Sequence, residues 1–228
     1  RPDRFWHLFL ERHTLMPMWK SWSPMSTGSW ALPLFGLFAF LSFLGALGES
    51  RHGARGGLSR LRPPGALGAV IGVLGSLLGL YVAGYTGVLL SVTNRPVWAD
   101  TTLLGALLVV SAVSISAALM VLLGRQRHRR SPAVLSLHRI DAQLLVVLLV
   151  ITIAMLVSLG AVAQGFLRPL PLLLLLFAVG IGMVAPLLLH WRSDRLGEHN
   201  LTVAAILVLA GGFILRTLVV FSGDGIVG

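Results

Sequence analysis

Six long apolar stretches, separated by short polar segments, dominate the pattern of the chain. Each has about 20 residues, the length that an α-helix needs to cross the hydrocarbon core of a bilayer. The apolar residues run continuously instead of alternating with polar ones, so we expect no β-strands. The predicted helices cover Ser29–Gly48, Ala66–Val92, Thr101–Gly124, Asp141–Gln164, Pro169–Trp191 and Asn200–Phe221. The pattern predicts an all-α integral membrane protein, with a transmembrane domain over residues 29–228 and an outer-side segment over residues 1–28.

The composition supports this class of protein. Hydrophobic residues make up 56% of the 228 residues and charged residues 11%, against about 25% charged residues in soluble domains. The net charge is +10, but the basic residues lie in the gaps between apolar stretches, so we expect no nucleic-acid partner. The chain contains no cysteine, which excludes disulfides and cysteine-ligated iron–sulfur clusters within it.

The basic residues also predict the orientation of the helices. If the helices alternate in direction, eleven Lys and Arg residues fall on one side of the membrane and six on the other. The positive-inside rule places the richer side in the cytoplasm and residues 1–28 on the outer side. The cluster Arg125–Arg130 contributes most to this difference, and binding of anionic lipid is its alternative role.

Polar side chains gather near the predicted outer ends of the helices. Tyr81 and Tyr85 lie one turn apart, Asn94 follows the same helix, and His7 precedes the first helix. Arg216 interrupts the last apolar stretch, where a charge costs roughly 2.5 to 3.5 kcal/mol at a helix centre. Donors at both ends of an apolar pocket suit a quinone head group, whose reduced form must also release protons. Alternatively, Tyr85 is an aromatic-belt residue, His7 is solvated, and the Arg216 side chain extends to the surface.

The predicted inner ends of the helices hold a second group of titratable residues. Asp141 begins the fourth predicted helix, where a carboxylate complements the helix dipole. Its alternative role is at the mouth of a proton pathway. His138 and His190 lie near inner helix ends and form a conceivable pair of haem ligands, although neither is deep within a helix. We expect no metal site.

Four segments occur in an order that is typical of one protein family. They are Arg1-Pro-Asp-Arg-Phe-Trp-His7, Ser23-Pro-Met-Ser-Thr-Gly-Ser-Trp30, Gly84-Tyr-Thr-Gly-Val-Leu-Leu90 with Pro96-Val-Trp98, and Gly211-Gly-Phe-Ile-Leu-Arg216. Each segment alone is a weak signal, but together they span nearly the whole chain. The ordered set resembles the NrfD-type family, the membrane subunits of polysulfide reductase and related respiratory complexes.

The resemblance implies an eight-helix subunit of two four-helix bundles in the bacterial cytoplasmic (inner) membrane. It implies a quinone substrate, menaquinone or ubiquinone, near the outer face and no cofactor within this subunit. Electrons would pass to or from a ferredoxin-like iron–sulfur subunit and then a molybdopterin oxidoreductase or cytochrome subunit.

The motifs of the family also imply roles for single residues. By resemblance, Tyr85 matches a quinone ligand and Arg216 a buried arginine linked to proton transfer. Asp141 falls near an acidic position of the family that is linked to proton transfer. His7 and Asn94 are the candidate donors to the other end of the quinone.

Two features depart from the family pattern. The first two helices are missing, and so is the acidic residue that usually precedes the first motif. Because the chain begins inside that motif, we expect further residues upstream of Arg1; the alternative is a shortened relative of the family. The leading hypothesis is a quinone-reactive subunit of a respiratory oxidoreductase, not catalytic alone, with proton translocation left open. A non-catalytic membrane anchor for redox subunits and a proton or solute transporter are the alternatives.

Overall fold

The computed structural model describes Trp6 and residues 9–11, 16–52, 66–127, 132–191 and 198–223. Within its helices, the side chains of residues 46–52, 67, 96, 125–127, 132–135, 198–199 and 223 lie outside this description. The described chain is helical, and its only β-type contact is an isolated bridge between Leu10 and Pro17.

Six helices are long and apolar enough to cross a membrane, which confirms the prediction of an all-α membrane protein. Their candidate spans are Pro24–Gly45, Gly68–Ser91, Leu103–Gly124, Ser136–Ser158, Pro169–Trp191 and Asn200–Ser222. The chain divides into two compact units, Arg1–Leu89 and Leu90–Gly228, and each unit is described by itself below.

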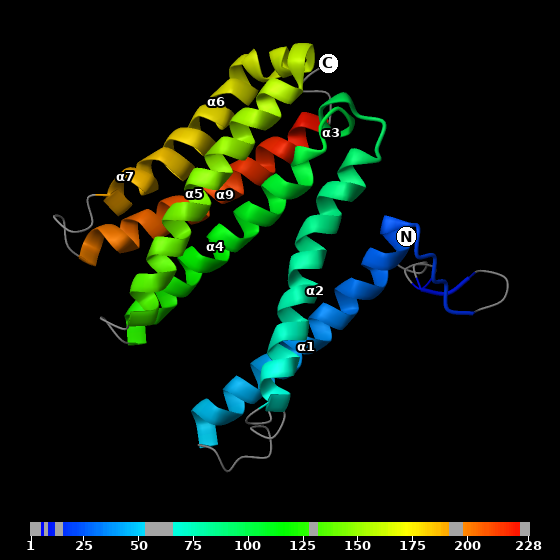
Figure 1. Cartoon of the computed structure of the whole chain (residues 1–228), viewed down its shortest axis with the longest axis vertical. Coiled ribbons are helices and arrows are strands. Elements are labelled where there is room, and N and C mark those ends of the chain that lie inside the picture. Colours follow the sequence, from blue (N-terminus) through cyan, green and yellow to red (C-terminus); the bar gives the residue numbers. More distant parts are fainter. Residues whose placement is uncertain are drawn as a thin grey trace. The chain divides into compact units, whose positions relative to one another are not determined.

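The first unit consists of α1 (Pro24–His52) and most of α2 (Ala66–Ser91), drawn in blue and cyan in Figure 1. Glycines of α2 receive aromatic side chains of α1. A Cβ atom added to Gly79 would lie 3.0 Å from the Phe35 ring, and one added to Gly75 would lie 3.5 Å from Phe38 Cβ. Later residues of α1 thus meet earlier residues of α2, and the two helices run antiparallel.

The start of α1 is set by a serine and a proline. Ser23 precedes the helix, and its Oγ accepts the backbone N–H of Ser26 at 3.4 Å. Pro24 takes the first helical position, where a missing N–H has no cost. The helix therefore begins five residues before the predicted start at Ser29.

The second unit is a bundle of four membrane-length segments (Figure 1). After the end of α2 come α3 (Pro96–Ala99), α4 (Leu103–Arg127), α5 (Pro132–Ser158), the 3₁₀-helix η4 (Gly160–Leu167), α6 (Pro169–Val179), the π-helix η5 (Gly180–Val184), α7 (Ala185–Trp191) and α9 (Glu198–Gly223). Helix α4 packs against α5 and α9, α6 and α7 pack against α9, and α5 packs against α7. Large apolar residues such as Leu107, Leu148 and Leu215 fill the centre.

Helix α5 differs most from its predicted bounds. It begins at Pro132, nine residues before Asp141, and ends at Ser158. Pro132 occupies the first helical position. The residues between Pro132 and Asp141 mix apolar and basic side chains, so the hydropathy pattern did not predict that they are helical. The chain then continues as η4, which begins at Gly160 with a φ of +52°. Glycine adopts this left-handed conformation without the steric cost that a Cβ atom adds.

The π-helix η5 divides the fifth spanning segment just before Pro186. The backbone N–H of Ala185 bonds the carbonyl of Gly180, five residues back. Pro186 has no N–H, and its ring disfavours the regular contact with the carbonyl four residues earlier. Widening the turn accommodates that ring. In this segment Gly182 meets Gly211 of α9 backbone to backbone, because a Cβ atom on either glycine would overlap the other residue.

Candidate functional site

Tyr85 lies on α2 with its ring half-buried against the start of α1. A Cβ atom on Gly28 would overlap this ring. The ring can pack against α1 at this position because residue 28 is a glycine. Within the described part of the chain, no residue forms a hydrogen bond with the Tyr85 hydroxyl. The hydroxyl group can therefore donate to a bound molecule.

Tyr81 lies one turn before Tyr85, and the two rings stack with centroids 6.1 Å apart at 9°. The Tyr81 hydroxyl donates to Thr27 Oγ1 at 2.7 Å. Thr27 uses its own hydrogen for a backbone carbonyl, that of Pro24 at 3.1 Å or that of Ser23 at 3.2 Å. This chain of hydrogen bonds fixes the Tyr81 ring, and that ring in turn supports the face of Tyr85.

The residues before α1 are tied to the helix by side-chain hydrogen bonds. Ser26 Oγ is buried, accepts the backbone N–H of Lys20 at 3.1 Å and donates to the carbonyl of Met18 at 3.3 Å. Trp30 Nε1 donates to the same carbonyl at 3.0 Å. The Ser23–Trp30 segment thus builds the helix start and supplies the glycine that receives Tyr85.

Neither of the other two predicted quinone ligands lies in the described part of the first unit. His7 lies outside the described residues. Asn94 is exposed in the turn after α2 and belongs to the second unit, whereas Tyr85 belongs to the first. A shared pocket for these three residues therefore stays a prediction.

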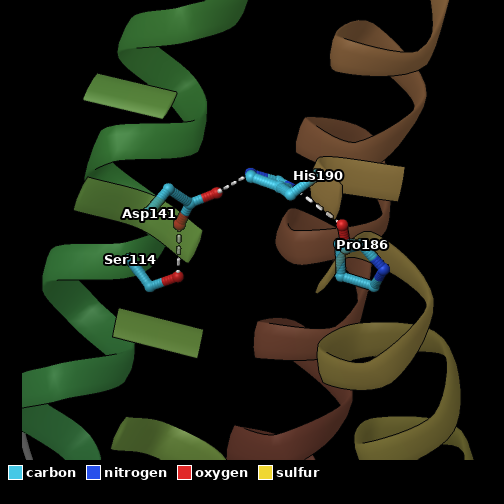
Figure 2. A network of polar contacts seen from close by, with 4 residues as sticks. All are labelled: Ser114, Asp141, Pro186 and His190. Atoms are coloured by element: carbon cyan, nitrogen blue, oxygen red, sulfur yellow. Dashed lines mark hydrogen bonds and ion pairs between the residues drawn. The ribbon is translucent and has the colours of Figure 1, made fainter. Parts of the chain in front are cut away.

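Asp141 lies inside α5, so its interpretation as a residue at the helix N-terminus is wrong. Its carboxyl group is almost fully buried, with 2% of the residue exposed. Ser114 Oγ of α4 donates to Oδ1 at 2.7 Å, and His190 Nε2 of α7 lies 3.4 Å from Oδ2. Figure 2 shows the carboxyl group between these two partners. A buried polar network connects three helices of the bundle.

His190 was considered from the sequence only as a conceivable haem ligand, and Ser114 was not singled out at all. The ring of His190 is buried, and Nδ1 lies 2.5 Å from the carbonyl oxygen of Pro186, one turn earlier in the same helix. The sequence offered a signal, because a histidine four residues after a proline interrupts an apolar stretch. The sequence could not show that α5 begins at Pro132, and therefore that Asp141 faces His190.

His138 of α5 stacks on His190, with ring centroids 4.1 Å apart and an angle of 20° between the planes. Haem ligation requires two ring nitrogens that point at one iron. Stacked rings present their faces to each other instead, so the two histidines do not have the geometry of a haem pair. Among the described residues there is no group of three or more side chains that could hold a metal ion.

Arg216 lies on α9 and is partly buried. Its Nη1 donates to the carbonyl of Gly212 at 3.4 Å. Gly212 and Ser114 both line a small cavity of about 10 Å³ in the bundle, which is close to the space needed by a single water molecule. Asp141 and Arg216 make no direct contact in the structure, and this cavity lies between their respective neighbours, Ser114 and Gly212.

Trp98, in α3, contributes to the fold of the second unit. Its Nε1 donates to the carbonyl of Val219 in α9 at 2.8 Å, and its ring packs on the central apolar cluster. Substituting Trp98 would therefore disturb the bundle itself.

A protein-family model described as "Polysulphide reductase, NrfD" matches residues 1–228, which is the whole chain. No curated protein and no solved structure matches the sequence. The match includes the ordered motifs: the Ser23–Trp30 segment builds the start of α1, Gly84–Leu90 carries Tyr85, and Gly211–Arg216 joins a close backbone contact to a partly buried arginine. The chain belongs to the NrfD (polysulphide reductase) family.

Proposed function

We propose that the chain is the quinone-reactive membrane subunit of a respiratory oxidoreductase. It exchanges electrons between membrane quinone or quinol and a peripheral iron–sulfur subunit near the outer face. Membership in a family of membrane subunits of redox complexes supports this proposal. The single observation that carries it is the Tyr85 hydroxyl, held on a stacked and half-buried ring and free to donate.

A quinone head group is a flat ring with an oxygen at each end, and the surroundings of Tyr85 suit one of these ends. The hydroxyl can donate to the quinone oxygen, while the stacked Tyr81 ring and the contact with Gly28 limit the directions in which Tyr85 can point. His7 and Asn94 are the proposed donors to the second oxygen. The isoprenoid tail lies in lipid along the exposed apolar side chains of α1 and α2.

The electrons leave the subunit through a partner. Oxidation of a quinol to a quinone releases two electrons and two protons. The chain has no cysteine to hold an iron–sulfur cluster, so the electrons pass to a ferredoxin-like subunit and then to a molybdopterin oxidoreductase or cytochrome subunit. The protons are handled by Arg216 and Asp141, buried groups of the second unit that hydrogen-bond to Gly212 and Ser114.

Replacing Tyr85 with Phe tests the proposal, and replacing Tyr81 with Phe is the matched control. Removing the Tyr85 hydroxyl should weaken quinone binding by about 0.5–1.5 kcal/mol, which is roughly a twofold to tenfold rise in Kd. The Tyr81 hydroxyl already bonds Thr27, so its removal should lower stability and leave quinone affinity nearly unchanged. The assay is quinol-driven reduction of the iron–sulfur signals in the purified complex, followed by electron paramagnetic resonance.

The two variants separate the proposal from its alternatives. Equal quinone affinity and equal turnover in Tyr85→Phe and the unmodified complex would reject Tyr85 as a ligand. A partner that co-purifies but never receives electrons from quinol would indicate a membrane anchor. A subunit that purifies without any redox partner would favour a transporter.

A further inference from the structure

The contacts of His190 determine which of its ring nitrogens carries a hydrogen. Nδ1 lies 2.5 Å from the carbonyl oxygen of Pro186, and a carbonyl oxygen only accepts hydrogen bonds, so Nδ1 must be protonated. In a neutral imidazole, Nε2 then has a lone pair and no hydrogen. Nε2 lies 3.4 Å from Asp141 Oδ2 (Figure 2).

The two facing atoms require a proton between them. A carboxylate oxygen is also an acceptor, so an ionised Asp141 beside a neutral His190 would set two lone pairs against each other. Ser114 does not relieve this conflict, because its hydroxyl donates to the other oxygen, Oδ1, at 2.7 Å. One proton placed on either Oδ2 or Nε2 removes this conflict, because a donor then faces an acceptor.

Burial favours the same proton count. The side chains of His190 and Asp141 are 4% and 3% exposed, and the surrounding helices are apolar. With no shared proton the pair has a net charge of −1, with one proton it is neutral, and with two it has a charge of +1. An uncompensated charge at this depth is costly, whereas the neutral pair is not.

We propose that Asp141 and His190 form a proton-storage site that holds one proton in the resting protein. The proton lies either on Asp141 Oδ2, beside a neutral imidazole, or on His190 Nε2, beside a carboxylate. Passing it between the two atoms breaks one bond, forms the other and leaves the net charge unchanged. The use of this proton during quinone chemistry rests on the proposed function, whereas the resting proton count follows from the geometry alone.

Other groups on α5, α4 and α7 face the pair. The ring of His138 stacks on His190, and positive charges on both rings at once would repel each other. The facing group on α4 is the neutral hydroxyl of Ser114, and the one on α7 is the Pro186 carbonyl. Arg139 of α5 is exposed. His138 is therefore the titratable neighbour in contact with the pair.

Helix α9 also packs against α4 and α7. Its first-turn residues Glu198 and His199 have side chains outside the described part of the chain. Arg216 lies on the same helix, and its guanidinium bonds the Gly212 carbonyl. Within the described residues, no hydrogen bond or ion pair joins Arg216 to Asp141.

The experiment measures the proton count in the full complex in lipid nanodiscs without quinone. The subunit is labelled with ¹⁵N-histidine and ¹³C-aspartate. Solid-state nuclear magnetic resonance reports the protonation of both nitrogens of His190, and infrared spectroscopy reports the carboxyl group of Asp141. Signals are assigned by their loss in His190→Gln and in Asp141→Asn, and either variant alone still assigns one member if the other fails to assemble. Asp100→Asn, which changes an exposed carboxyl group, is the control and should leave both signals in place.

Four combinations of protonation states can be observed at neutral pH. A carboxylic acid beside a neutral imidazole, or a carboxylate beside an imidazolium, gives the expected count of one proton. A carboxylate beside a neutral imidazole, or a carboxylic acid beside an imidazolium, would overturn the proposal.

The role in quinone chemistry is tested in the same sample by adding quinol. The Asp141 and His190 signals should change reversibly as quinol is oxidised. Unchanged signals during active turnover would overturn the storage role. A complex that does not oxidise quinol would instead contradict the proposed function, and the resting proton count would still be measured.

Discussion

Single glycines and serines determine whether the two polar sites can exist. At Gly28 the absence of a side chain gives the Tyr85 ring its place, and at Ser114 one hydroxyl group binds the buried carboxyl group of Asp141. Neither residue has chemistry of its own to offer a quinone or a proton. Each acts by fixing the position of a neighbour that does, and substitutions at these two positions test that role.

Replacing Gly28 with Ala should displace the Tyr85 ring and reduce quinol oxidation by about tenfold or more, because overpacking costs about 1–3 kcal/mol. The matched control is Gly72→Ala, since a Cβ atom on Gly72 meets nothing within 4 Å. Both changes raise helix propensity by about 1 kcal/mol, so that effect cancels in the comparison. Equal quinol turnover in the two variants would show that the contact with Gly28 does not position Tyr85.

Replacing Ser114 with Ala should lower the free energy of unfolding by about 1–3 kcal/mol, because a buried carboxyl oxygen loses its donor. Ser116 provides the control on the same helix. Its hydroxyl is exposed and bonds only the carbonyl of Ala112, so Ser116→Ala should change stability by less than about 0.5 kcal/mol. Thermal unfolding of the two variants in detergent measures the difference, and similar losses would contradict the role assigned to Ser114.

At the scale of elements, the close contact between η5 and α9 sets the distance between two spanning segments. Gly182 and Gly211 meet backbone to backbone, as small residues permit in membrane helices. Gly211→Ala should therefore force the helices apart and destabilise the bundle by about 1–3 kcal/mol or more. Gly180→Ala, whose Cβ atom meets nothing within 4 Å, should leave the melting temperature nearly unchanged. A Gly211→Ala protein that is as stable as the Gly180→Ala protein would show that the contact can relax.

The elements also show how far the sequence alone could lead. The number of long apolar helices followed from hydropathy, because lipid-facing helices are apolar over a full membrane thickness. Hydropathy did not predict where α1 and α5 begin. Pro24 and Pro132 start these helices in polar or mixed segments, which have no continuous apolar pattern. The error at α5 moved Asp141 from a helix interior to a helix end. Its pairing with His190 therefore depended on a register that the apolar pattern could not supply.

The candidate site was predictable to a different extent in each unit. Tyr85 was predicted as a quinone ligand from its motif, and that role stays a prediction; the structure adds the stacking of its ring on Tyr81. The network of Asp141, Ser114 and His190 joins residues far apart in the sequence. Pairs of this kind depend on packing between helices, which no local pattern of residues reports.

At the scale of the whole molecule, apolar and polar residues are distributed as a membrane protein requires. Large apolar side chains such as Leu37, Phe43 and Val150 are exposed, whereas Ser111 and Thr152 are buried within the bundle. Lipid therefore contacts the apolar surface, and the buried hydroxyls of Ser111 and Thr152 donate to the backbone carbonyls of Leu108 and Leu148.

The absence of cysteine makes the orientation in the membrane directly testable. Asn94→Cys, in the exposed turn after α2, should react with a membrane-impermeant maleimide in intact spheroplasts. Arg129→Cys, at a position of the basic cluster outside the described residues, should react only after the membrane is permeabilised, because the positive-inside rule places it in the cytoplasm. The reverse pattern of labelling would invert the predicted orientation and move the Tyr85 site to the cytoplasmic side. The unmodified protein has no thiol and provides the blank.

The proline that widens the helix at η5 also imposes a constraint on the length of the chain. Gly182, Pro186 and His190 follow one another at intervals of four residues, so the backbone contact, the acceptor carbonyl and the imidazole lie on successive turns of one segment. Inserting one residue between Gly182 and His190 would leave the hydropathy profile almost unaltered, yet it would turn the imidazole by about 100° relative to the glycine. The register of this segment, and not its hydropathy alone, therefore brings the imidazole to Asp141.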